Sequence, residues 1–176
     1  IVHDHTHIKD PGALRKVTAL VGTGAAMVDK KLLTMLPNVK LIAICGVGYD
    51  GVDVAAAKEK GIVVTHTPGV LTDDVADLAL GLMLSIGRRI PQADRFVRNG
   101  DWVNDVFPMT RKVSGATLGI VGMGRIGQAI AKRAVAFDMC VLYTSREPKV
   151  GVPYTFYQTA TALAAEVDYL VVAVPG

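Results

Sequence analysis

The sequence is poor in the residues that mark several classes of protein. It contains two cysteines, one tryptophan and only 6% aromatic residues. Cys45 and Cys140 stand far apart in apolar runs, with no CxxC pair and no metal-ligand spacing. This argues against a disulfide or metal framework. We therefore expect both thiols to be reduced and to lie in the core of a cytoplasmic protein.

Excess charge of one sign and long apolar runs are also scarce. The 19 basic and 16 acidic residues give a net charge of +3, and no basic run exceeds two residues. This balance predicts no nucleic-acid partner. The most apolar run, residues 78–86, is well short of the about 20 residues that a membrane-spanning helix needs, and no segment has the pattern of a signal peptide. The sequence predicts a soluble chain.

What the sequence does contain is a repeated order of strand-like and helix-like segments. Continuous apolar runs predict strands that are covered on both faces, and strand–helix–strand order predicts parallel sheets. The expected fold is α/β, with two doubly wound parallel-sheet lobes. The expected strands are residues 18–24, 39–46, 62–69, 117–122, 140–145, 155–157 and 169–176, and the expected helices are 26–38, 53–61, 72–89, 125–138 and 159–166. A polar, irregular stretch at 98–115 predicts a boundary between a lobe at 1–97 and a lobe at 98–176.

The segment 72–89 has the features of a buried helix. Thr72 is a good N-cap, Asp73 and Asp74 suit the positive end of the helix dipole, and Arg88–Arg89 suit the negative end. Apolar residues cover nearly every face of this helix, so we expect it to be buried between lobes or against a second subunit. This favours a homodimer contact.

A glycine motif between an expected strand and an expected helix carries the chemistry. The run TLGIVGMGRIGQAIAKRA contains Gly122, Gly124 and Gly127 in GxGxxG spacing. In this context the first glycine allows a tight turn, the second admits a pyrophosphate, and the third allows close helix–strand packing. The start of the helix supplies N–H groups for phosphate. The motif predicts a dinucleotide site.

The tip of the next strand indicates which dinucleotide is preferred. An NAD site usually has a carboxylate there, about 20 residues after the glycines, but this chain has Ser145 and Arg146, with Lys149 just beyond. A hydroxyl donor and a planar cation suit the 2′-phosphate of NADPH, whereas a carboxylate would repel it. We therefore expect NADPH to be preferred, with NAD a possible second cofactor.

Several motifs in order resemble the D-isomer-specific 2-hydroxyacid dehydrogenases, particularly their glyoxylate/hydroxypyruvate reductase branch. These motifs are ICGVGYDGVDVAAAKEKGIVVTHTPGVLTDDVADLALGLML, TLGIVGMGRIGQAIAKR and the strand end VVAVPG. The resemblance implies a flavodoxin-like substrate lobe, a Rossmann dinucleotide-binding lobe and an active site in the cleft between them. It also implies a small 2-oxo acid, such as glyoxylate or hydroxypyruvate, as substrate.

The resemblance also implies roles for particular residues. Backbone N–H groups of Val47 and Gly48 would bind the substrate carboxylate, as a glycine-bearing turn can. Leu71 and Thr72 would line the nicotinamide side. The remaining implied cofactor contacts are Gly124, Arg125 and Ile126 at the pyrophosphate, and Val174 and Pro175 near the second half of the cofactor.

The chain departs from the family pattern in two respects. Relatives commonly read Asn-Thr-Pro where this chain has His66-Thr67-Pro68, and the role of His66 is left open. The arginine, glutamate and histidine that the family uses in catalysis lie beyond the position that matches Gly176. The sequence therefore suggests a truncated chain with no catalytic residue of its own. The alternative is a non-catalytic dinucleotide-sensing module with a protein partner. An NAD-using relative acting on formate or phosphite is disfavoured by Ser145 and Arg146.

The histidines near the start invite a metal hypothesis. His3, His5 and His7 alternate, so that on a strand all three would face one way. No cluster of carboxylates or cysteines elsewhere completes a ligand shell. We expect a surface edge strand here and no metal site.

Overall fold

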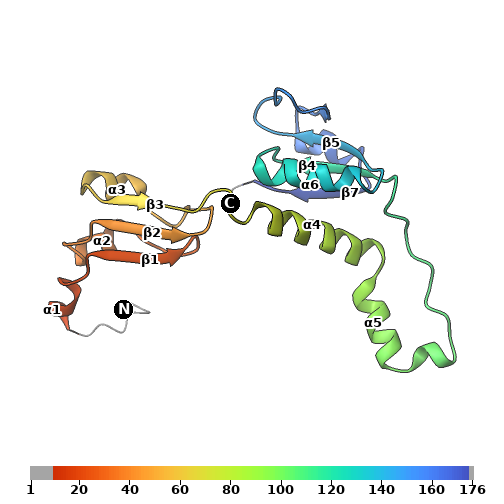
Figure 1. Cartoon of the computed structure of the whole chain (residues 1–176), viewed down its shortest axis with the longest axis horizontal. Coiled ribbons are helices and arrows are strands. Elements are labelled where there is room, and N and C mark those ends of the chain that lie inside the picture. The colour runs from red at the N-terminus through yellow and green to blue at the C-terminus, as the bar shows by residue number, and fades with distance from the viewer. Residues whose placement is uncertain (1–9, 175–176) are drawn as a thin grey trace. The chain divides into compact units, whose positions relative to one another are not determined.

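A computed structural model describes residues 10–174, and Figure 1 shows their helices and strands along the chain. The described residues form two compact units, one ending at Leu71 and the other spanning Thr72–Val174. The sequence had placed the boundary between residues 97 and 98. The division falls earlier because helix α4 (Thr72–Gly87) packs on helix α6 (Arg125–Val135) of the second unit.

The first unit is a three-stranded parallel sheet with short connecting helices. Its strands lie in the order β1-β2-β3 (Figure 1), with bounds Ala19–Thr23, Leu41–Cys45 and Val63–Thr65. Helix α1 (Pro11–Leu14) precedes β1, and the connecting helices are α2 (Lys30–Met35) and α3 (Val54–Glu59). Asp29 and Asp53 cap the two connecting helices by accepting hydrogen bonds from the N–H groups of Leu32 and Ala56.

The core of the first unit lies on one face of its sheet. Strand positions on this face, such as Ile42 and Ile44, are buried together with side chains of α2 and α3. On the other face Val21 is 81% exposed and Val63 is 58% exposed. The prediction that these strands are covered on both faces is therefore wrong for the described residues, because both connecting helices pack on the same side.

The second unit is a four-stranded parallel sheet in the order β6-β5-β4-β7. The strands are β4 (Thr117–Val121), β5 (Cys140–Thr144), β6 (Thr155–Phe156) and β7 (Tyr169–Val172), with helix α7 (Ala160–Ala164) before β7. Strands β5 and β6 lie on one side of β4, whereas β7 lies on the other. The strand order thus reverses at β4, and the crevice at the carboxyl ends of strands at such a point is where α/β folds bind ligands.

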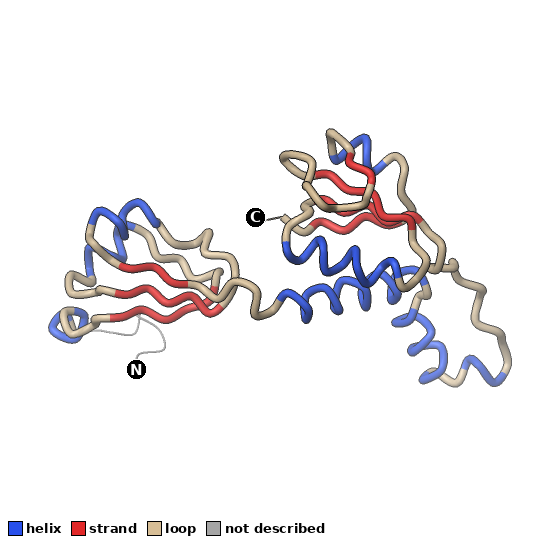
Figure 2. Tube along the Cα trace, turned by 45° about the horizontal axis from the view of Figure 1, so that its top comes forward, coloured by secondary structure: helices blue, strands red, loops and turns tan. Residues whose placement is uncertain are grey.

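Helix α4 runs beside α6 in both views (Figures 1 and 2). Its inner face joins the core of the second unit through Ala76, Leu80, Met83 and Gly87. On its other face Leu78, Leu82 and Ile86 are 60%, 56% and 74% exposed. Within the described chain this helix is therefore buried along one face, not all round.

One helix in the second unit was not expected from the sequence. Helix α5 (Ile90–Arg98) and the 3-10 turn η2 (Asp101–Val103) lie at and beyond the end of the α4 pattern. Arg89 is in the left-handed region, with φ 52°, and separates α5 from α4. Pro91 fits the first turn of α5, since the N–H that proline lacks has no helical partner there.

The prediction that both cysteines lie in the core is wrong. Cys45 is the last residue of β2 and Cys140 the first residue of β5, and both are exposed. Both residues belong to apolar runs that extend to the ends of their strands. The helices that pack on each sheet do not cover these strand ends. Among residues 10–174, no helix has both the length and the apolar character required to cross a membrane.

The metal expectation falls on His3, His5 and His7, which lie outside the described residues. In the part of the chain that the structure describes, no group of histidine, cysteine and carboxylate side chains is arranged to hold a metal ion.

Candidate functional site

The glycine loop connects β4 to α6 at the point where the strand order reverses. The Gly122 N–H donates to the Thr144 carbonyl at the end of β5 (2.8 Å), and the Ala173 N–H after β7 donates to the Val121 carbonyl (2.7 Å). These bonds fix the loop between the carboxyl ends of both neighbouring strands. The structure thus confirms a strand–glycine loop–helix arrangement at residues 117–135.

Each of the three glycines of the motif meets a different structural requirement. Gly122 has φ +100°, and a Cβ there would lie 2.5 Å from the Ala173 carbonyl oxygen. A Cβ on Gly127 would overlap the Gly122 carbonyl oxygen, so this glycine allows α6 to pack on the loop. A Cβ on Gly124 would meet no atom of residues 10–174 within 4 Å. The second glycine is therefore not required by packing, and it leaves the open space that a bound ligand needs.

The first turn of α6 presents unpaired donors at this loop. Gly124 is the N-cap and its carbonyl accepts from the Gln128 N–H, but no side chain caps the helix. Among residues 10–174, the N–H groups of Arg125, Ile126 and Gly127 donate to no acceptor. Three unpaired donors at the positive end of an eleven-residue helix suit the charge and geometry of a pyrophosphate.

The loop after β5 brings together the residues expected at the adenosine ribose. Tyr143 is buried, and its hydroxyl accepts from the Lys149 N–H at 2.9 Å, which holds the loop back against the strand. Arg146 and Lys149 are exposed. Ser145 donates its hydroxyl to the Glu147 carbonyl within the same loop, so it shapes the turn. A bond from this hydroxyl to a phosphate would require it to leave that acceptor, and Arg146 is the stronger candidate donor.

The remaining predicted cofactor residues fall in three places. Val174 lies beside the glycine loop, with its Cγ1 2.8 Å from the position that a Cβ on Gly122 would take. Thr72 is the first residue of α4 in the second unit, whereas Leu71 is the last residue of the first unit. Pro175 lies outside the described residues.

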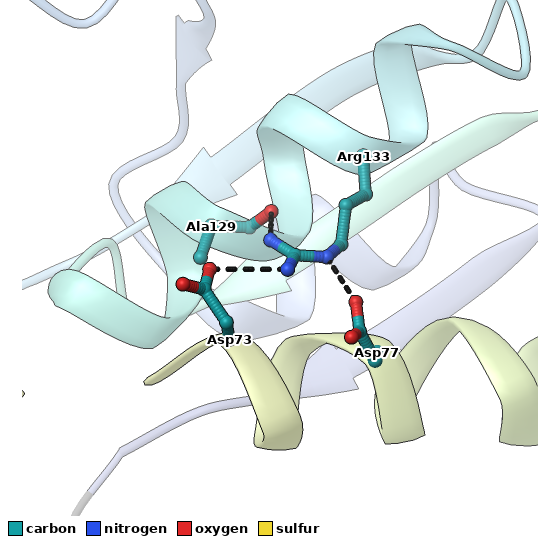
Figure 3. A network of polar contacts seen from close by, with 4 residues as sticks. All are labelled: Asp73, Asp77, Ala129 and Arg133. Carbon is teal, nitrogen blue, oxygen red and sulfur yellow. Dashed lines mark hydrogen bonds and ion pairs between the residues drawn. The ribbon is translucent and has the colours of Figure 1, made fainter. Parts of the chain in front are cut away.

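An arginine clamp holds the start of α4 on α6 (Figure 3). Arg133 donates from Nη2 to Asp73 Oδ1 at 3.0 Å, from Nε to Asp77, and from Nη1 to the Ala129 carbonyl at 3.1 Å. The hydrogen bond to Asp77, and next the one to Asp73, raises the pKa of Arg133, partly opposed by desolvation. The clamp therefore remains charged, and it fixes the helix that begins at Thr72 on the helix that begins at the glycine loop.

The carboxylate loop, which we define as residues 46–48, follows β2 in the first unit. Gly46 has φ +151°, and Gly48 is exposed. Among the described residues the N–H groups of Val47 and Gly48 donate to no acceptor. A Cβ on Gly24 would overlap the Gly48 carbonyl oxygen, so the loop after β1 supports this turn closely. Two adjacent N–H groups without an acceptor are the donors that a backbone anion site requires.

The Asp50 carboxylate lies close to Gly48. Its Oδ2 lies 3.2 Å from the position that a Cβ on Gly48 would take. An anion bound at the carboxylate loop therefore has this carboxylate as a neighbour of like charge, which opposes binding while the side chain keeps this rotamer.

Reasoning from the sequence missed three supports of these sites. The first is Arg133, which pairs with both Asp73 and Asp77. These aspartates stand four residues apart and so lie on one face of a helix, which is a signal for a shared cationic partner. The support from Gly24 and the anchor from the Tyr143 hydroxyl depend on contacts between distant segments. No local sequence pattern predicts such contacts.

The sequence profile of the D-isomer specific 2-hydroxyacid dehydrogenases, catalytic domain, matches residues 5–171. Among curated proteins, the chain is 49% identical over 159 residues to glyoxylate/hydroxypyruvate reductase A HPR2 of Arabidopsis thaliana, covering 90% of this chain and 51% of that protein. It is 45% identical over 174 residues to the glyoxylate reductase of Thermococcus litoralis, covering 92% and 52% respectively. The chain thus spans about half the length of these relatives.

Solved structures show the same likeness. The NADPH-dependent glyoxylate/hydroxypyruvate reductase of Sinorhizobium meliloti, in complex with NADP and malonate, superimposes with a TM-score of 0.86 at 41% sequence identity. The match covers 95% of this chain and 54% of that one. The fold of two parallel α/β units is thus also the fold of an NADP-binding relative.

Proposed function

The chain belongs to the D-isomer specific 2-hydroxyacid dehydrogenase family, and from this premise we propose that it is part of an NADPH-preferring reductase of small 2-oxo acids such as glyoxylate or hydroxypyruvate. The observation that carries the proposal is the open glycine loop, where three N–H groups at the start of α6 have no acceptor among the described residues. It supports dinucleotide binding, and the exposed cation of Arg146 after β5 supports the phosphorylated form.

The residues of the second unit fit NADPH by charge and space. The first turn of α6 would hold the pyrophosphate, and Arg146, with Lys149 beside it, would hold the 2′-phosphate. Gly124 would admit the cofactor because no atom of the described residues lies within 4 Å of the position that a Cβ would take. When bound, the nicotinamide supplies the hydride for reduction of a carbonyl. The chain's own contribution is to bind and orient it.

The residues of the first unit fit the substrate carboxylate. The N–H groups of Val47 and Gly48 would donate to its oxygens, leaving the 2-oxo group oriented for reduction. Binding through backbone donors is compatible with any small 2-oxo acid, so this loop selects the carboxylate and not the rest of the substrate.

Turnover tests the proposal directly. The protein produced at its natural length should oxidise NADPH when glyoxylate or hydroxypyruvate is added, and the loss of nicotinamide absorbance measures the rate. Tight NADPH binding without oxidation of the cofactor by either acid would contradict the reductase. That result would favour the dinucleotide-sensing alternative.

We also propose that α4 forms part of a homodimer interface. Leu78, Leu82 and Ile86 are successive residues four apart on one helix face, and each is more than half exposed. A stripe of large apolar side chains on an ordered helix favours association, because burying each of them removes apolar surface from water.

The dimer is tested by replacing the central residue of this stripe. We expect the unaltered protein to sediment as a dimer and Leu82→Asp to sediment as a monomer, since the new carboxylate would be buried in the interface. Val135→Asp is the matched control, because Val135 is 51% exposed on α6 and lies outside the stripe. A monomeric unaltered protein, or a Leu82→Asp variant that remains dimeric, would contradict the assignment.

A further inference from the structure

His66 makes a specific contact with the carboxylate loop. Its Nδ1 lies 2.9 Å from the Val47 carbonyl oxygen. A carbonyl oxygen has no proton to give, so Nδ1 must carry the hydrogen and donate. The Tyr49 ring packs edge-on against the imidazole, with centroids 5.0 Å apart and planes at 77°, which orients the ring.

Thr67, the next residue, holds Gly46, the first residue of the same loop. Its N–H donates to the Gly46 carbonyl at 2.8 Å, and its hydroxyl donates to that carbonyl at 3.1 Å while accepting from the Gly46 N–H at 2.9 Å. Both backbone groups of Gly46 are therefore bonded to the segment after β3. In the same loop, the backbone N–H groups of Val47 and Gly48 donate to no acceptor among residues 10–174.

The hydrogen bond from His66 also determines the orientation of the peptide unit between Val47 and Gly48. The Val47 carbonyl and the Gly48 N–H belong to one planar trans peptide and point in opposite directions. Donation from His66 Nδ1 to this carbonyl therefore fixes the direction of the Gly48 N–H, away from the imidazole. Rotation of this peptide would break the histidine bond.

We propose that His66 is a positioning residue for carboxylate binding: by holding the Val47 carbonyl, it aims the Gly48 N–H at the carboxylate of the substrate. The inference deepens the proposed function and rests on its assignment of the carboxylate to Val47 and Gly48. His66 acts through the backbone and makes no contact with the substrate itself.

Three replacements separate this role from bulk or polarity. In asparagine the amide nitrogen stands the same number of bonds from Cα as Nδ1 does, so His66→Asn keeps a donor for the Val47 carbonyl. In glutamine the nitrogen stands one bond further out, so His66→Gln keeps the amide but moves the donor. His66→Leu removes the donor. His66 is exposed, so none of these changes removes a core contact.

In the experiment, the protein at its natural length is titrated with oxalate, and the NMR amide resonance of Gly48 reports binding. NADPH affinity is measured separately on the same proteins. We expect oxalate to bind about tenfold more weakly to His66→Leu and His66→Gln, as for one lost hydrogen bond, and His66→Asn to keep the original affinity within about threefold. The KM for glyoxylate should follow the same order with little change in kcat. NADPH affinity should be the same in all four proteins.

Undiminished oxalate affinity in His66→Leu would overturn the positioning role while leaving the reductase proposal intact. An unaltered protein whose Gly48 resonance ignores oxalate would overturn both the carboxylate assignment and the role of His66. Absence of turnover with intact NADPH and oxalate binding would contradict the reductase alone. A global loss of amide dispersion in His66→Asn would mean that His66 supports the fold, and this too would overturn the proposal.

Discussion

Gly127→Ala should abolish NADPH binding and destabilise the second unit. A Cβ at this position would overlap the Gly122 carbonyl oxygen and lie 3.3 Å from Ile120 Cγ2, so α6 must move away from the loop. Overpacking of this kind costs about 1–3 kcal/mol. Displacement of α6 also moves the N–H groups of Arg125 and Ile126 from the positions that suit a pyrophosphate. Denaturant unfolding and NADPH titration measure the two effects separately.

Two other glycines provide matched controls for this substitution. Gly124→Ala should fold with normal stability and still lose cofactor affinity, because its Cβ meets no atom of the described residues but enters the space left for the ligand. Gly81→Ala, in the middle of α4 with nothing near its Cβ, should gain about 0.5–1 kcal/mol without any effect on binding. If Gly124→Ala bound NADPH normally, the glycine loop would not be the pyrophosphate site.

Arg146→Asp should reverse the cofactor preference. Arg146 is exposed at the tip of β5, and a charge-assisted hydrogen bond from its guanidinium to a phosphate is worth about 1.5–3 kcal/mol. Its loss corresponds to a roughly tenfold to hundredfold fall in NADPH affinity. The new carboxylate would accept hydrogen bonds from an unphosphorylated ribose, so NADH affinity should rise. Equilibrium titration with each cofactor gives the ratio.

Lys132→Asp is the control for the change in net charge. Lys132 is exposed in the last turn of α6, and its replacement alters the charge of the protein by the same amount. A general electrostatic effect would lower NADPH affinity equally in Lys132→Asp and Arg146→Asp. An equal loss in the two variants would therefore contradict a specific role for Arg146. The stability of Arg146→Asp should be unchanged, because no described residue forms an ion pair with Arg146.

The sequence predicted the glycine-loop region of the second unit more accurately than the start of α2 in the first. The glycine motif, the strand before it and the helix after it are local patterns and begin where expected, although α6 ends at Val135 and not at the expected Asp138. Helix α2 is shorter than its apolar pattern: Val28, at the start of that pattern, pairs with Val52 as an isolated bridge before the helix begins at Lys30. A pairing with a distant residue overrode the local preference there.

The candidate sites show the same division between local and distant causes. The positions of Gly122, Gly124 and Gly127 follow from the motif, although the close approach at Gly122 comes from the distant Ala173. The role of Ser145 at the cofactor stays a prediction, and the sequence analysis did not include the bond from its hydroxyl to the Glu147 carbonyl. His66 was left undecided because its partner, Val47, lies 19 residues earlier in the chain, and only the fold brings the two together.

The central claim is that the unit spanning Thr72–Val174 binds a dinucleotide at its glycine loop and reads the 2′-phosphate with Arg146. Separate equilibrium titrations of the unaltered protein with NADPH and NADH test it most directly. The account predicts saturable binding of both, with NADPH tighter by roughly tenfold to a hundredfold. Equal affinities for the two cofactors, or tighter binding of NADH, would contradict it.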